Sequence, residues 1–156
     1  IKQLYDVGRL FDRVDNLTIT EAAFSKIAPV ELGYRGLPTS DVSLIYEDIR
    51  QTALNISTRG FVDKEKFALL QKGIISIRPF MYRQNYKIED AITDASKAAY
   101  LATLLEKGIR EVRHYNGNPL SVSDMTISGR LTTKLNKLRM GNPEAFFYWS
   151  LTDALL

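Results

Sequence analysis

The sequence predicts a mainly α-helical protein, a multi-helix bundle of about six or seven helices. Apolar residues recur at steps of three and four along most of the 156 residues, which is the spacing of one helix face. Capping residues, glycines and prolines separate these periodic segments where helices start and end. Only the stretch from about residue 110 to 125 loses the helical spacing.

The first two helices are predicted before residue 37. From Leu4, apolar side chains recur down to Val14, so one amphipathic helix occupies the start of the chain. Thr18 and Glu21 have the spacing of a capping box, which predicts a second helix from this point. We expect that helix to end near residues 34–36 and to be bent or broken at Pro29, which has no backbone N–H to donate.

Three further helices follow in the middle of the chain. Ser40 or Asp41 can cap the third helix, and Gly60 is suited to end it. Asp63 begins the fourth, and Pro79 argues for its end. The clearest helix is "YKIEDAITDASKAAYLATLLEKG", because its apolar face is regular and rich in alanine, which indicates close approach to a neighbouring helix.

The last third of the chain is less uniform. The dipeptide Asn116–Gly117 favours a tight turn and leaves open one short β-hairpin near residues 110–122. Helical spacing returns at Leu131, Leu135 and Leu138. Asn142–Pro143 is then typical of a cap and first position, which predicts a final helix, "NPEAFFYWSLTDALL".

Composition excludes several classes of protein. The chain is 45% hydrophobic and 25% charged, and no apolar run approaches the roughly 20 residues of a membrane-spanning helix. With no Cys and one His, disulfides, a structural zinc site and Ser–His catalysis are nearly excluded. We expect a cytoplasmic protein with no membrane partner, and no metal-ligand set within the chain.

Asp6 is the first candidate functional residue. It shares a helix with two cations, Lys2 four residues before and Arg9 three residues after. The pattern fits a solvated helix face with surface ion pairs. It also fits a carboxylate at the edge of an anion-binding site, and the spacing alone does not decide between these interpretations.

A second candidate is a basic stripe formed by Arg130, Lys134 and Lys137. These residues lie opposite the leucines of the predicted helix, and residues 125–140 contain no acid. Such a stripe fits a contact with an RNA backbone, and it equally fits the solvent-exposed face of an amphipathic helix. Asp90 and Asp94 could likewise act together in acid–base chemistry, but their polar neighbours favour a solvent-facing pair.

The first residues of the chain resemble a known family. "KQLYDVGRLFD" is similar to the last conserved motif of AbiEii/AbiGii-type nucleotidyltransferases, in which a basic residue precedes an aromatic–aspartate pair on a helix. "FALLQKGIISIRPFMYRQNYKIEDAITDASKAAYLATLL" and "FFYWSLTDALL" resemble the helical C-terminal region of Bacteroidota-like members. These proteins are toxins of bacterial toxin–antitoxin and phage-defence (abortive infection) systems.

This resemblance implies a protein in two parts. Residues 1–15 would be the terminal helix of a missing nucleotidyltransferase core, and residues 16–156 a helical C-terminal domain. The family's core holds Mg²⁺ and a nucleoside triphosphate (NTP) through a Gly-Ser motif and a D-x-D pair, and the parent transfers a nucleotide to an acceptor such as tRNA. Of the family's site, only Asp6 is matched as an active-site residue, with Lys2 as the basic position.

Because the Gly-Ser motif and the D-x-D pair are missing, this chain alone is expected to be inactive and to hold no cofactor itself. The implied partners are the missing core, an RNA acceptor and an antitoxin. A stand-alone helical protein- or RNA-binding module without enzymatic activity is the alternative. The sequence leaves the acceptor, toxicity and oligomeric state open.

Overall fold

A computed structural model describes residues 1–80 and 85–156 of the chain. Residues 81–84, which belong to the second stretch that carries the family resemblance, lie outside the described residues. The described part contains seven α-helices and no extended strand, which confirms the predicted helical bundle. The helices are α1 (Lys2–Phe11), α2 (Thr18–Tyr34), α3 (Ser43–Ser57), α4 (Lys64–Ser76), α5 (Ile88–Glu106), α6 (Leu138–Gly141) and α7 (Pro143–Leu155). Short 3-10 helices lie at η1 (Arg78–Phe80), η2 (Pro119–Val122) and η3 (Thr133–Lys137).

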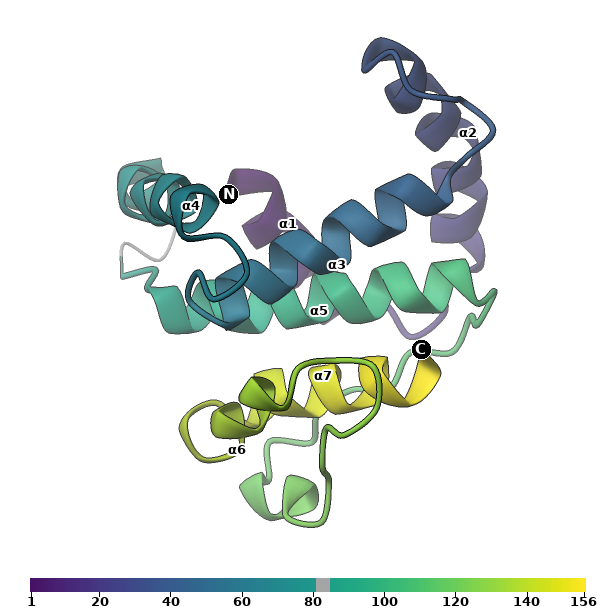
Figure 1. Cartoon of the computed structure of the whole chain (residues 1–156). Helices are drawn as coiled ribbons and strands as arrows, with labels where there is room; N and C mark the ends of the chain where they lie inside the picture. The colour runs from purple at the N-terminus through teal and green to yellow at the C-terminus, as the bar shows by residue number, and fades with distance from the viewer. Residues whose placement is uncertain (81–84) are drawn as a thin grey trace.

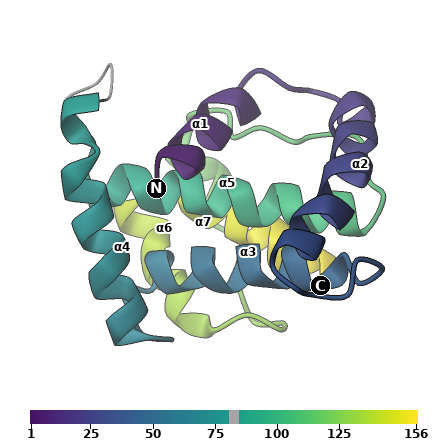
Figure 2. The same ribbon diagram turned by 90° about the horizontal axis from the view of Figure 1, so that it is seen from above.

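The long helix α5 is the centre of the bundle (Figure 1). It packs against α3, α7 and α1, and these helices lie on different sides of it. Its alanines at positions 91, 95, 99 and 102 are buried, so the neighbouring helices can approach closely, as their spacing predicted. Figure 2 shows α4 and α2 at opposite ends of α3 and α5.

The C-terminal helix α7 buries four consecutive aromatic residues, Phe146–Trp149. This burial is possible because α7 packs against α5 and also against η2, η3 and α6, so other segments of the chain cover several of its faces. The indole of Trp149 donates a hydrogen bond to Ser57 Oγ on α3 at 3.0 Å. The cap at Asn142, predicted from Asn-Pro, accepts a hydrogen bond from the backbone N–H of Ala145.

The helix α1 is held on α5 by buried charge and by a glycine. Gly8 packs directly over Asp94, whose side chain is fully buried. Arg9 donates a hydrogen bond to Asp94 at 2.8 Å, and Lys97 bridges Asp12 at 2.6 Å and Glu144 of α7 at 2.8 Å. The prediction that Asp90 and Asp94 form a solvent-facing pair is therefore wrong for Asp94, because α1 covers it.

The β-hairpin near residues 110–122 does not form. Gly117 makes its turn with a φ of 79°, but the flanking segments do not pair with each other. Instead, Glu111 forms an isolated antiparallel bridge with Asn16, next to the start of α2. Asn118 accepts a hydrogen bond from Leu120 N and caps η2, so the chain after the turn becomes helical.

The helix predicted to carry Leu131, Leu135 and Leu138 is shorter than expected. The carboxylate of Asp153 accepts hydrogen bonds from three backbone N–H groups within residues 128–131, and Asn136 bonds to both backbone groups of Ile127. These side chains take the place of helical backbone partners. Thr132 therefore caps a 3-10 helix at residues 133–137, and α6 begins only at Leu138.

Several helix ends differ from the predicted positions, although one cap is confirmed. Asp63 caps α4 as expected, since its side chain accepts a hydrogen bond from Lys66 N. At α2, however, the N-cap is Leu17, which has no side-chain cap hydrogen bond, and Asn16 just before it accepts a hydrogen bond from Thr18 N. The helix continues through Pro29 without a break. The cap of α3 lies at Val42, after both predicted residues, and it has no side-chain hydrogen bond.

The contact between Gly8 and Asp94 leads to a stability test. In a Gly8→Ala variant, the new Cβ would come within 2.9 Å of the Asp94 Cβ and would overlap its carboxylate. We expect the free energy of unfolding, measured in urea, to fall by about 3 kcal/mol. Gly141→Ala on α6 is the matched control, because nothing lies within 4 Å of the added Cβ. Equal stability of the two variants would contradict this packing of α1 on α5.

Candidate functional site

The basic residues predicted to bind substrate divide into two groups. Lys134 and Lys137 line one open pocket of about 570 Å³, whereas Arg130 lies in the bend before η3 and is not part of that lining. The pocket also receives Arg59, Gly60 and Phe61 from the turn after α3, Lys64 from α4 and Glu89 from α5. We call this site the basic pocket. Its volume is within the range of small-molecule sites in proteins.

Chain folding brings these cations together from distant parts of the sequence. Arg59 and Gly60 both adopt positive φ angles, 52° and 82°, which turn the chain sharply between α3 and α4. A side chain at position 60 would come within 2.9 Å of the Phe67 Cβ, so only glycine suits this turn. The turn places Arg59 and Phe61 opposite η3, which carries both lysines.

The charge of the basic pocket is strongly positive. Its lining contains four cations and one acid, Glu89, which pairs with Arg59 at 2.8 Å. The pKa of Glu89 is lowered by a hydrogen bond from its own backbone and by the Arg59 guanidinium. Lys64 and Lys137 form no ion pair within the described part of the chain. Their ammonium groups are therefore available to an anionic ligand.

Phe61 adds an aromatic surface to the basic pocket. Its side chain is 55% exposed, and the Lys134 ammonium lies 3.1 Å from the centre of the ring. Such a cation–π contact holds the lysine at the pocket without neutralising its charge. Phosphate groups are attracted by the cations, and the ring edge offers an apolar contact to a nucleobase.

Asp6 and Lys2 lie elsewhere, on α1. They form an exposed ion pair at 2.8 Å, and the Asp6 side chain is 46% exposed. Arg9, the other cation predicted to surround Asp6, turns away and pairs with Asp94. Within residues 1–80 and 85–156, no three His, Asp or Glu side chains gather closely enough to hold a metal ion.

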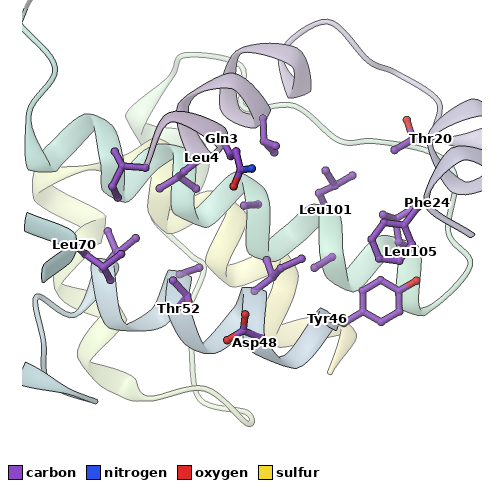
Figure 3. Close-up of a pocket in the computed structure, with 17 residues that line it drawn as sticks. Gln3, Leu4, Thr20, Phe24, Tyr46, Asp48, Thr52, Leu70, Leu101 and Leu105 are labelled. Atoms are coloured by element: carbon purple, nitrogen blue, oxygen red, sulfur yellow. The ribbon is translucent and has the colours of Figure 1, made fainter. Parts of the chain in front are cut away.

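An apolar trough of about 440 Å³ runs between α1 and α3 (Figure 3). Leu4 and Val7 of α1 form one wall, α3 forms the other, and Leu101 and Leu105 of α5 lie between them. Polar groups such as Gln3, Asp48 and Thr52 occur along the lining. The trough has no basic lining residue, so it does not suit a nucleotide phosphate and fits an apolar surface instead.

The buried acid Asp94 has a structural role, and neither of its carboxylate oxygens is free to bind a ligand. Burial raises its pKa, although hydrogen bonds from Arg9 and from the Tyr86 hydroxyl and the nearby Lys97 charge act in the opposite direction. Both carboxylate oxygens are used, Oδ1 by Arg9 and Oδ2 by Tyr86. Asp90 accepts a hydrogen bond from Lys87 N and caps α5. The two acids therefore do not form a catalytic pair.

Sequence reasoning found two of the four cations in the basic pocket. Arg59 and Lys64 were missed because more than 60 residues separate them from η3, and no spacing rule connects them. The signal that could have found them is the run Arg59-Gly60-Phe61 between two predicted helices, where a basic and an aromatic residue flank a turn glycine.

Comparison with known proteins yields no relative. No protein-family model matches the chain, and neither a curated protein nor a solved structure is significantly similar to it. None of the described helices has the length and apolar character needed to cross a membrane.

The buried tyrosine at Asp94 predicts a pH dependence. Burial, followed by the Asp94 charge and hydrogen bond, raises the pKa of Tyr86 far above its ordinary value of 10.0. Above pH 10 the unfolded chain therefore loses this proton before the folded chain does, and the free energy of unfolding falls. We expect Tyr86→Phe to reduce that fall by up to about 1.4 kcal/mol per pH unit, measured by urea unfolding between pH 9 and 11.

Tyr34→Phe is the control for loss of a hydroxyl, since Tyr34 is exposed on α2. An identical alkaline slope for wild type and the Tyr86→Phe variant would contradict the buried hydrogen bond to Asp94.

Proposed function

We propose that the basic pocket binds the phosphates of RNA and that the chain is the helical C-terminal part of an AbiEii-like nucleotidyltransferase. The observation that carries the proposal is the meeting of Arg59, Lys64, Lys134 and Lys137 around one pocket with Phe61 at its edge. Clustered cations beside an aromatic ring are the recognition surface that single-stranded nucleic acids use.

The charge of the whole chain supports this choice of ligand. The net charge is +3, from 21 basic and 18 acidic residues. The pocket lining has four of the basic residues and one of the acids, so the rest of the chain is balanced. The positive charge of the molecule is thus concentrated in the basic pocket, which favours a local polyanion contact over a diffuse one.

The nucleotidyltransferase part of the proposal depends on the resemblance of "KQLYDVGRLFD" to the family motif. In the parent, Asp6 would position the nucleotide or the acceptor, and Lys2 would orient the Asp6 carboxylate through their ion pair. Mg²⁺ and the NTP would be held by the missing core. The apolar trough beside α1 is a suitable surface for that core to cover.

The parent would act in the bacterial cytoplasm on an acceptor such as tRNA, with an antitoxin as a further partner. A stand-alone helical RNA-binding module is the second candidate, favoured by the fact that the four pocket cations all come from this chain. The coding sequence upstream of Ile1 separates the two. A stop codon within a few residues would end the nucleotidyltransferase proposal and leave RNA binding intact.

Removal of the pocket lysines tests RNA binding. We expect Lys134→Gln/Lys137→Gln to bind tRNA at least about tenfold more weakly than wild type in a filter or fluorescence assay. The slope of log affinity against log salt should become shallower by about two, because two phosphate contacts are lost.

The matched control is Lys72→Gln/Lys107→Gln, which removes the same charge from two exposed lysines outside the pocket. Equal weakening by both double variants would mean that only net charge matters. A salt-independent affinity would rule out phosphate binding altogether.

The catalytic proposal has its own test. We expect the 156-residue chain alone to transfer no nucleotide from labelled NTPs to tRNA, because no metal-binding carboxylate cluster occurs among its described residues. In the full parent, Asp6→Asn should abolish transfer with unchanged folding, whereas Asp124→Asn, at an exposed site on the loop after η2, should not. Transfer by the isolated chain, or full activity of the Asp6→Asn parent, would overturn this role.

A further inference from the structure

The helix α2 carries two apolar sets of side chains. Its inner face packs on the bundle through Ala28 and Leu32, which are buried, and through Phe24, whose ring stacks on Tyr46 at 5.2 Å. Its outer side carries a second apolar set, which is exposed to solvent and of which Ile27 also borders the groove between α2 and α3. We call this set the α2 stripe; it consists of Ile19, Ala23, Ile27, Val30 and Tyr34.

The α2 stripe is continuous and unusually exposed. At about 100° per residue, all five side chains project within one sector of the helix surface. Ile19 is 84% exposed and Tyr34 is 82% exposed. Figures 1 and 2 show α2 at the edge of the bundle, with its outer side away from the other helices. A contiguous exposed apolar patch of this kind marks an interaction site, so this face is suited to a partner.

We infer that α2 pairs with α2 of a second copy of this chain, with the two helices parallel. The step from Ala23 to Ile27 is four residues, the step to Val30 is three, and the step to Tyr34 is four. This 4-3-4 spacing is the core pattern of two-stranded coiled coils. No charged residue interrupts it, so the stripe complements itself.

Two charged residues beside the stripe determine the direction of pairing. Lys26 lies along one edge and Glu31 along the other, five residues further on. Both are exposed, and neither forms an ion pair with the described residues. In a parallel pair, Lys26 of each copy faces Glu31 of the other, the interhelical contact that specifies coiled-coil partners. An antiparallel pair would bring like edges, and so like charges, together.

The pairing is expected to be weak. The contact involves about three turns of each helix, below the area of a standard stable interface, so we expect a dissociation constant on the order of 10 μM to 100 μM. The dimer would use a surface built from α2 alone. It is therefore independent of the basic pocket and of RNA binding.

Sedimentation equilibrium of the intact 156-residue chain from 1 to 500 μM tests the inference. Wild type should change from monomer to dimer across this range. Ile27→Lys should raise the dissociation constant at least tenfold, while Leu69→Lys, at a comparably exposed leucine on α4, should not. Both variants should fold, because each replaced side chain is already exposed. Circular dichroism provides the check.

Charge reversal tests the parallel direction. Lys26→Glu and Glu31→Lys should each weaken the dimer several-fold, because each places like charges opposite each other in a parallel pair. The double variant Lys26→Glu/Glu31→Lys should recover the wild-type dissociation constant. Antiparallel helices would give single variants that dimerise no worse than wild type, which would overturn the proposed geometry.

An alternative dimer, in which the α2 stripe of one copy docks in the apolar trough of the other, gives a distinct result. If α2 of the second copy entered the apolar trough, Ala98→Glu in the trough lining would dissociate the dimer. With α2–α2 pairing, that variant should dimerise as wild type does. A monomeric wild type at 500 μM, or dissociation by Ala98→Glu, would overturn the inference.

Discussion

The carboxylate of Asp94 lies in the interior of the bundle with no exposure to water, and hydrogen bonds from α1 and from the segment before α5 compensate for its burial. The Arg9 guanidinium and the Tyr86 hydroxyl occupy its two oxygens, and Gly8 allows the helices to come close enough for this contact. A buried ion pair is costly to break because one partner is left without compensation. The position of α1, and with it one wall of the apolar trough, depends on this contact.

The same constraint extends to the C-terminal helix. Lys97, one turn after Asp94 on α5, is nearly fully buried and binds Asp12 at the C-cap of α1 and Glu144 of α7. One ammonium group therefore ties three helices together at the centre of the molecule. Around it, the rings of Phe11, Tyr100 and Tyr148 pack edge to face or tilted, so apolar burial surrounds the charged contacts and keeps water out.

The two candidate surfaces, the basic pocket and the apolar trough, follow from how this core is enclosed. The trough exists because α5 is covered by α3, α7 and α1 but remains accessible between α1 and α3. The basic pocket exists because the turn at Arg59–Gly60 faces η3, and η3 is held there by the hydrogen bonds of Asp153 and Asn136 to the segment before it. The apolar trough and the cationic pocket require different partners.

The sequence by itself determined the helical class, most helix positions, and the caps at Asp63 and Asn142, because periodicity and capping are local properties of the chain. It also indicated that Lys134 and Lys137 belong to one basic surface. Only the tertiary structure decided that Asp94 is buried, that residues 110–122 form no hairpin, and that Arg59 and Lys64 join the lysines while Arg130 does not. Each of these depends on a partner more than 20 residues away in sequence: Arg9 for Asp94, Asn16 for Glu111, and Asp153 for residues 128–131. Contacts over such separations follow from packing and leave no periodic signal in the sequence.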